Sequence, residues 1–251
     1  MHVNTRTVVP PEWRVPVEEA WSAYAAGTVP VGAAIVDPAG RVVSRGRNRI
    51  FDDPVPGQIG RTRLAHAEVN AILGLPTDGT DPRSLTLYTT AEPCPLCVGA
   101  TVMSNIRAVR YASRDPFAGS IGLLEANWYL RSKAIVVRGP EDASLEGVLM
   151  AIGTEFHLRA SGPRVTELVA RSASVRPDAV ALGERLHRSR AWESLRDRNI
   201  DDAFAALAIA LDSSTESVRG AIDPELPEER RARIPDRGSA RQLEPAGVAL
   251  R

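Results

Sequence analysis

Residues 64 to 105 hold the side chains whose types and spacing could do chemistry. His66 and Glu68 lie two positions apart, and Cys94 and Cys97 follow within the sequence PCPLC. Two thiolates and one imidazole can hold Zn²⁺ and leave one coordination position for water, which is the arrangement of a catalytic zinc. Glu68 would then stand beside that water, where a carboxylate can accept a proton and pass it on.

Each part of this set has a simpler explanation when it is taken alone. Cys94 and Cys97 are the only two cysteines of the chain. They could form a redox-active dithiol, a disulfide or a pair of buried small hydrophobic residues. A lone His-x-Glu on a helix is mostly coincidence. The order, the spacing and the proline before Cys94 together favour the metal site, because H-x-E followed by P-C-x-x-C is a signature of zinc deaminases.

On these residues the sequence resembles the cytidine/deoxycytidylate deaminase superfamily, which includes guanine, cytosine and transfer-RNA adenosine deaminases. The resemblance covers about residues 15–140. It implies Zn²⁺ as the cofactor, held by His66, Cys94 and Cys97, with Glu68 as the catalytic residue. It also implies a homodimer.

The same resemblance implies two contacts to the substrate ring. One is Asn48, which precedes the histidine, and the other is the backbone around Ala67 and Cys94. Asn48 also lies at the end of an expected strand, where it could equally be a turn former. Its role is therefore open between these two readings.

The elements expected around these residues alternate between strands and helices. Helical patterns begin at Pro16, His66 and Cys94, and apolar runs predict strands at 31–37, 41–48, 84–90, 109–113 and 134–139. An opening hairpin followed by this alternation predicts an α/β fold, a three-layer α/β/α sandwich with a five-stranded mixed sheet. The resemblance implies the same fold. Both metal-binding segments fall at helix N-termini, where the helix dipole favours thiolate over thiol.

The chain beyond the expected sandwich reads as a C-terminal helical extension. The sequence SGP near residue 162 marks a linker. We therefore expect a zinc-dependent deaminase domain at 1–160, a helical module at 163–225 and a disordered tail at 226–251. Residues 203–222 have helix–turn–helix proportions, but the second helix offers one arginine beside a glutamate, so packing helices are the better reading. His157 and His187 are expected to be packing or surface residues.

Composition and charge restrict the partners of this chain. Its 251 residues are 43% hydrophobic and 25% charged, which is ordinary for a globular protein. The 31 basic and 31 acidic residues balance both before and after residue 160. This is not the basic excess of a nucleic-acid-binding protein. The absence of a membrane-length apolar run and of a signal-peptide core, together with two metal-spaced cysteines, predicts a cytoplasmic protein.

The predicted function is hydrolytic deamination, which uses water and releases ammonia from the exocyclic amine of a free nucleobase, a nucleoside or a related small heterocycle. Transfer-RNA adenosine deamination stays an alternative. The loop from Arg114 to Ser120 resembles that branch, whereas residues 49–65 form a longer segment than that branch has. That longer segment, together with the balanced charge, favours the small substrate.

Two further alternatives remain. A nucleotide substrate could bind through Arg61 or Arg63, although solvated loop arginines are the simpler account. A non-enzymatic, zinc-stabilised binding or regulatory module is the alternative from another class. Glu68 argues against that module, because a structural zinc site is usually closed by a fourth protein ligand and has no use for a free carboxylate.

Overall fold

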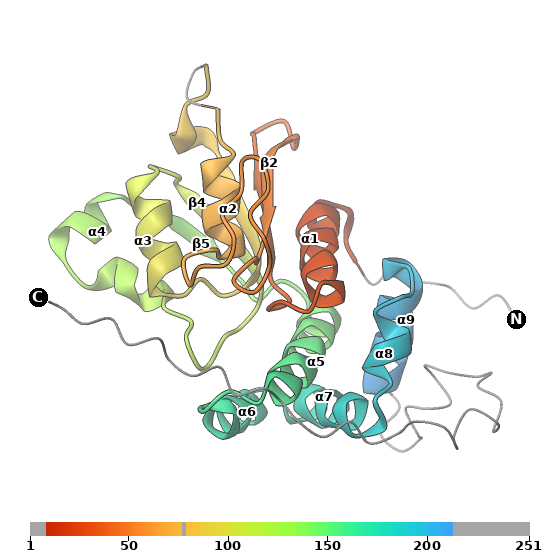
Figure 1. Ribbon diagram of the computed structural model, residues 1–251. Coiled ribbons are helices and arrows are strands. Elements are labelled where there is room, and N and C mark those ends of the chain that lie inside the picture. The colour runs from red at the N-terminus through yellow and green to blue at the C-terminus, as the bar shows by residue number, and fades with distance from the viewer. Residues whose placement is uncertain (1–8, 77–78, 213–251) are drawn as a thin grey trace, which may run out of the picture.

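A five-stranded sheet with helices on both faces forms the centre of the computed structural model, which describes residues 9–76 and 79–212 (Figure 1). The strands are β1 (Gly32–Val36), β2 (Val42–Arg47), β3 (Thr86–Ala91), β4 (Ala108–Ser113) and β5 (Val136–Arg138), in the order β2-β1-β3-β4-β5. β1 pairs antiparallel with β2 and β3, whereas β3, β4 and β5 run parallel. The predicted mixed sheet and its opening hairpin are thus confirmed.

The helices follow the strands in alternation and then continue without strands. The α-helices are α1 (Arg14–Ala25), α2 (Ala67–Leu73), α3 (Pro95–Met103), α4 (Trp128–Ser132), α5 (Ala143–Ala160), α6 (Val165–Ala173), α7 (Pro177–Ser189), α8 (Trp192–Leu195) and α9 (Ile200–Asp212). Short 3₁₀ helices are η1 (Pro11–Trp13), η2 (Pro82–Ser84) and η3 (Ile121–Glu125). Within the described residues, no helix is both long and apolar enough to cross a membrane.

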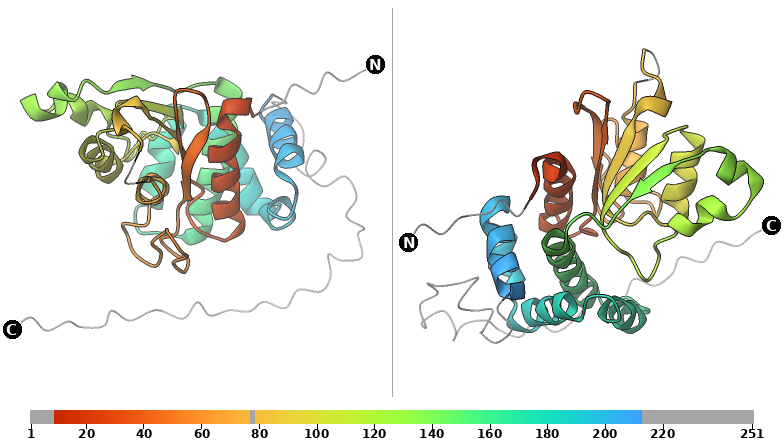
Figure 2. Two further views of the ribbon diagram at one scale, coloured as in Figure 1. Left: turned by 90° about the horizontal axis from the view of Figure 1, so that it is seen from above. Right: turned by 180° about the vertical axis from the view of Figure 1, so that it is seen from behind.

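The sheet is covered on both faces, which is why β1 reads as an uninterrupted apolar run. Ile35 and Leu87 point to the face that α2 covers. α1 and α5 cover the opposite face (Figure 2). Gly32 and Gly46 allow the close approach of α1 and α2, because a Cβ on either would meet helix backbone within about 2.5 Å. The three-layer α/β/α sandwich is therefore confirmed.

The C-terminal helical extension packs on the α1/α5 side of the sandwich. Its large buried side chains include Leu182 of α7 and Phe204 of α9, and they share one apolar cluster with Trp21 of α1 and Ile152 of α5. The extension itself is confirmed, and Ser161 ends α5 in the left-handed conformation, with φ of 50°. The division into separate domains at residues 160–163 stays a prediction.

A buried polar contact reinforces this shared cluster. Glu155 of α5 is fully buried and accepts hydrogen bonds from Tyr24 Oη at 2.8 Å and from Arg159 Nε at 3.0 Å. The guanidinium of Arg159 in turn lies 4.2 Å from the centre of the Trp192 ring. Because both oxygens of the buried carboxylate are satisfied, Glu155 links α1, α5 and α8 at little desolvation cost.

Several expected boundaries were wrong. The helix expected to begin at Pro16 begins two residues earlier, at Arg14, and the preceding Trp13 is completely buried. The apolar spacing of residues 121–130 predicts one amphipathic helix, but this segment forms η3 followed by the start of α4. The helical pattern that runs through residues 177–195 is broken at Arg190, whose left-handed φ of 58° separates α7 from α8. The expected tail at 226–251 and the second half of the helix–turn–helix pattern lie outside the described residues.

Truncation after residue 162 tests the predicted domain division. The zinc-binding residues lie on the α2/α3 side of the sheet, so we expect the truncated protein to retain about one zinc per chain. Its thermal midpoint should fall by on the order of 10 °C or more, because the apolar face of α5 loses its cover. Zinc content and thermal unfolding are compared with the full chain. An insoluble or metal-free fragment would show that the helices belong to the same folding unit.

Candidate metal centre

Three metal-ligating side chains converge where α2 and α3 begin. His66 is the N-cap of α2, Cys94 is the N-cap of α3, and Cys97 lies in the first turn of α3. Nδ1 of His66 is 3.5 Å from the sulfur of Cys94 and 3.5 Å from the sulfur of Cys97, and the two sulfurs are 3.6 Å apart. β3 leads directly to α3 and pairs with β1, and this arrangement brings the two helix starts together.

The arrangement fits a tetrahedral zinc ion. Zn–S bonds of about 2.3 Å and Zn–N bonds of about 2.0–2.1 Å at tetrahedral angles place the donor atoms roughly 3.5–3.8 Å apart. The three measured separations, 3.5, 3.5 and 3.6 Å, match this spacing. Within the described residues, these three are the one group of His, Cys, Asp and Glu side chains that converges in this way. A tetrahedral ion held by three donors retains an open position.

The two thiols are electronically unequal when no metal is bound. The two sulfurs share a hydrogen bond, which lowers the pKa of Cys94 to about 4. The same bond, together with burial, raises the pKa of Cys97 above its usual range. One proton is thus shared between two sulfurs, and a dication between them would replace it and leave both as thiolates.

Glu68 lies in the first turn of α2 and points to the same region without joining the ligand group. It is 3% exposed, and its Oε1 accepts a hydrogen bond from the Thr89 hydroxyl at 3.0 Å. Burial raises the pKa of Glu68, against the opposing effect of His66. The carboxylate is therefore held in one orientation and is more easily protonated than an exposed glutamate.

Asn48 is also held in a fixed orientation. It is buried just after β2, and its Oδ1 accepts hydrogen bonds from the Thr28 hydroxyl at 2.9 Å and from the backbone N–H of Ile50 at 3.1 Å. The second bond is that of a turn former, so the turn reading of Asn48 is correct in part. With the oxygen engaged, the amide nitrogen is the group that Asn48 can offer to a ligand.

The segment between Asn48 and His66 is closed on itself and attached to α2. Asn70, fully buried one turn after His66, donates to the carbonyls of Arg47 and Ile59 and accepts from the N–H of Ile59. Arg61, which could have met a phosphate, forms an ion pair with Asp53 instead. The segment is thus a loop that is held in place by hydrogen bonds and ion pairs.

The loop after β4 is fixed from two sides. Glu146 of α5 accepts hydrogen bonds from the backbone N–H, Nε and Nη2 of Arg114. At the other end of the loop, the N–H of Ser120 donates to the carbonyl of Pro93, next to Cys94. The hydrogen bonds and the Arg114 charge hold the pKa of Glu146 below its usual range despite the burial that opposes them. α5 therefore positions a loop that borders the metal centre.

Sequence reasoning found the converging residues and missed those that hold them. Thr28, Thr89, Asn70 and Glu146 were not singled out. A buried polar residue in an apolar helix is a signal that could have marked Asn70, four positions after His66. Ala67 lies at the first position of α2, where its N–H has no partner within the helix and could face a ligand.

Two comparisons of sequence bear on this centre. The family model for the "cytidine and deoxycytidylate deaminase zinc-binding region" matches residues 13–113, which contain all three candidate ligands. A transfer-RNA-specific adenosine deaminase of Bacillus subtilis (strain 168) is 31% identical over 156 residues, which are 59% of this chain and 90% of the relative. The match to the zinc-binding region and the His/Cys/Cys set support Zn²⁺ as the cofactor.

Two further proteins show a more limited similarity, in the share of the relative that is covered for the first and in sequence identity for the second. A tRNA(Ile)-lysidine synthase of Deinococcus deserti is 36% identical over 115 residues, which are 43% of this chain, and the chain spans only 20% of that relative. A solved guanine deaminase of Nitrosomonas europaea is 26% identical, with a TM-score of 0.42 over 60% of this chain and 86% of the other. From the zinc-binding region and the match along nearly all of the Bacillus protein, the chain belongs to the cytidine and deoxycytidylate deaminase family.

Proposed function

We propose that this chain is a zinc-dependent aminohydrolase that releases ammonia from the exocyclic amine of a small, uncharged heterocycle. The observation that carries the proposal is a buried, oriented carboxylate, Glu68, beside a three-donor metal set. His66, Cys94 and Cys97 hold the metal. Zn²⁺ in this position lowers the pKa of a bound water. A purely structural site would have a fourth protein ligand and no need of Glu68.

Glu68 carries the protons of the reaction. It accepts one proton from water while the water oxygen bonds to the ring carbon that bears the amine, and it passes this proton to the ring nitrogen. It then accepts the second proton from the new hydroxyl group and passes it to the amine, so that the C–N bond breaks, ammonia leaves and a carbonyl remains on the ring. Burial raises the pKa of Glu68, which suits a group that must both take and give a proton near neutral pH. The Thr89 hydroxyl keeps the carboxylate in place between the two transfers.

Asn48 and the start of α2 orient the ring. The Asn48 amide nitrogen can donate to a ring oxygen or nitrogen, since the side-chain oxygen is engaged by Thr28 and Ile50. The N–H groups of the first turn of α2, beginning at Ala67, offer further donors. The substrate would therefore be held by neutral hydrogen bonds rather than by ion pairs.

The charges on the adjoining loops favour an uncharged substrate. Four arginines on or beside these loops are engaged by carboxylates of the same chain, and the pairs are Arg47 and Arg49 with Asp52, Arg61 with Asp53, and Arg114 with Glu146. A guanidinium that is already paired contributes little to binding a phosphate. Together with the zero net charge, this favours a base or nucleoside over a polyanion.

Transfer-RNA adenosine deamination is the second candidate. The Bacillus relative that matches along most of its length carries that name, and the loop from Arg114 to Ser120 resembles that branch. Arg63 does not take part in the ion pairs of its loop, and its guanidinium could therefore contact a phosphate. This candidate uses the same zinc chemistry and differs only in what surrounds the reacting ring.

A homodimer is the proposed assembly. Trp128 is 76% exposed and Met103 is 69% exposed, and the hydroxyl of Tyr129 contacts the Met103 sulfur at 3.7 Å. Met103 ends α3 and Trp128 begins α4, and these two helices lie on the side of the sandwich away from the C-terminal helices (Figure 1). Exposed apolar surface of this kind is characteristic of an interface between chains.

Cys97→Ala tests the metal ligands. Purified protein should hold about one tightly bound zinc per chain, and the variant should lose it and unfold at lower temperature, because the metal links α2 to α3. Metal analysis and thermal unfolding measure both effects. Ser104→Ala, at the C-cap of the same helix, removes a hydroxyl that donates to the Ala100 carbonyl, and this variant should keep its zinc. Full zinc occupancy in Cys97→Ala would refute the ligand assignment.

Glu68→Gln separates proton transfer from structure. The variant should keep zinc and fold, because the amide can still accept the Thr89 hydrogen bond and Glu68 is not a ligand. Turnover should fall by about 10²–10⁴, the range expected for removal of a general acid–base. Ammonia release is measured alongside zinc content. Near-normal turnover with full zinc would place the proton carrier elsewhere.

Salt dependence of activity discriminates between the two substrate candidates. Ammonia release is measured for adenine, guanine, cytosine and their nucleosides, and for a transfer-RNA anticodon stem-loop, at two salt concentrations. For a small neutral substrate, we expect kcat/KM to change little with salt. An enzyme that neutralises several phosphates would lose on the order of 10³ in affinity between about 50 and 200 mM salt. Turnover confined to the stem-loop and weakened by salt would favour the second candidate.

A further inference from the structure

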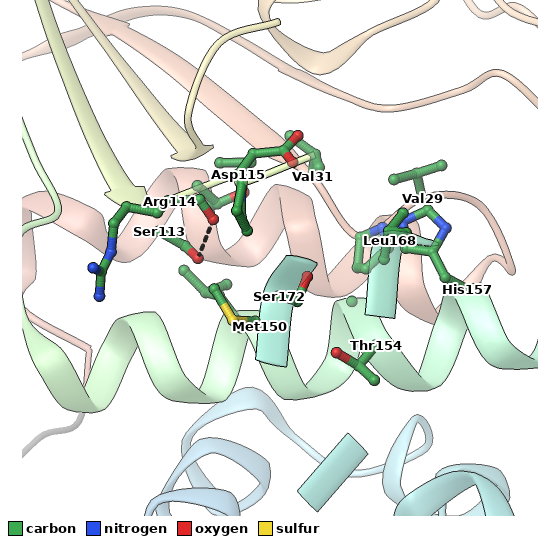
Figure 3. A pocket seen from close by; sticks show the side chains of 16 residues that line it. Val29, Val31, Ser113, Arg114, Asp115, Met150, Thr154, His157, Leu168 and Ser172 are labelled. Carbon is green, nitrogen blue, oxygen red and sulfur yellow. Dashed lines mark hydrogen bonds between the residues drawn. The ribbon is translucent and has the colours of Figure 1, made fainter. Parts of the chain in front are cut away.

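A cavity of about 130 Å³ lies between the carboxyl ends of β3 and β4 and the helices α5 and α6 (Figure 3). Its walls are largely apolar and include Val31, Leu149 and Leu168. An engineered cavity of about 150 Å³ in another protein admits benzene, so this space accommodates roughly one five- or six-membered ring.

The cavity opens beside the proposed reaction centre. Ala91 lines it and precedes Cys94 by three residues, so their Cα atoms are at most about 11 Å apart. Val29 also lines it and directly follows Thr28, the partner of Asn48. Thr89 faces Glu68, whereas the next residue, Thr90, lines the cavity, so the two places lie on opposite sides of β3 near its carboxyl end. A ligand that occupies both must pass around this end of the strand, where Ala91 and Val29 line the cavity.

Two adjacent residues of α5 at this wall are unfavourable for stability. Gly153 weakens the helix, and Thr154 buries a hydroxyl that has no partner within the protein. Gly153 lies in the middle of an 18-residue helix, where glycine is unfavourable, yet nothing lies within 4 Å of the position its Cβ would take. Gly183, by contrast, is required by a close neighbour, because a Cβ there would meet the carbonyl oxygen of Ala151 at 2.5 Å. Thr154 is 2% exposed and its hydroxyl has no hydrogen-bond partner within the protein. Such local costs without a structural return are typical of binding sites.

The wall combines neutral polar groups with two charged residues, Arg114 and Asp115, that are engaged within the protein. Ser172 of α6 is buried, and burial lowers the pKa of His157, so its imidazole is uncharged at neutral pH with one donor and one acceptor. Arg114 turns away from the other lining residues toward Glu146 (Figure 3). The Asp115 carboxylate accepts the N–H groups of Phe117 and Ala118. The cavity thus offers hydroxyl and imidazole partners to a ligand and no unpaired cation to a phosphate.

We propose that this cavity binds an uncharged, hydroxyl-bearing ring of the substrate, the sugar of a nucleoside, through Thr154, Ser172 and His157. The proposal rests on the proposed function, because it places the sugar where the reacting base is at the zinc centre. It assigns the choice among base, nucleoside and nucleotide to the C-terminal helices. The preferred order is nucleoside over free base, and nucleoside over nucleoside monophosphate.

Thr154→Val tests the proposal with a variant of nearly equal volume. It removes a buried hydroxyl that lacks a protein partner, so its thermal midpoint should be unchanged or higher. Its kcat/KM for adenosine, guanosine or cytidine, whichever is turned over, should fall about tenfold, the factor for one neutral hydrogen bond, while that for the matching base stays within about twofold. Thr166→Val, on the exposed side of α6, is the matched control and should change neither.

Gly153 gives a graded second test. Gly153→Ala should stabilise α5 and narrow the cavity slightly, and Gly153→Leu should fill it and abolish the preference for the nucleoside while the base is still deaminated. Equal losses for base and nucleoside in Thr154→Val, or a nucleoside monophosphate that reacts as well as the nucleoside in the unmodified protein, would overturn the proposal.

Binding measured without turnover separates this proposal from the proposed function. Equilibrium binding of the same nucleosides is measured on the zinc-loaded Glu68→Gln protein, with and without Thr154→Val. If no small heterocycle is deaminated, the proposed function fails. The cavity assignment then stands if a nucleoside binds and Thr154→Val weakens that binding about tenfold. It falls if no nucleoside binds or if Thr154→Val leaves the binding unchanged.

Discussion

The convergence of two helix N-termini near the carboxyl end of the central strand β3 is the constraint on which the rest of the structure depends. His66 comes from the start of α2, and both cysteines come from the start of α3. Two sulfurs 3.6 Å apart cannot both be anionic without a compensating cation, and their unequal pKa values reflect this. The helix dipoles contribute part of that compensation, and a dication between the three donors contributes the rest.

Each group that would act on a ligand is held by a polar residue from a neighbouring element. Thr89 of β3 orients Glu68 of α2, and Thr28, before β1, orients Asn48 after β2. Neither partner is near in sequence to the group that it holds. β3 and the segment before β1 therefore fix the site through hydrogen bonds to residues of other elements. These bonds limit the rotamers available to Glu68 and Asn48.

The two faces of the sheet carry different parts of the structure. The α2/α3 face holds the metal centre, and the α1/α5 face holds the C-terminal helices and the largest apolar cluster. α5 connects them, because Glu146 fixes the loop after β4 while Glu155 joins α1 and Arg159. The cavity lies between α5, α6 and the carboxyl ends of β3 and β4. The proposed sugar site would thus be built from α5 and α6 together with the carboxyl ends of β3 and β4.

The sequence by itself determined the ligand set, the fold class and most elements. Metal ligands must be specific residue types at close local spacing, and strands buried on both faces must be apolar, so both leave readable patterns. It misplaced the start of α1 and the helix after Ser120, because end positions depend on packing, as the complete burial of Trp13 shows.

The tertiary structure alone decided the partners and the cavity. Thr89, Asn70 and Glu146 act through contacts with residues at least eleven positions away, which no local pattern encodes. The same is true of Thr154. Its type is ordinary for a helix, and only the packing of α5 against α6 and the sheet edge leaves its hydroxyl buried without a protein partner beside an open space.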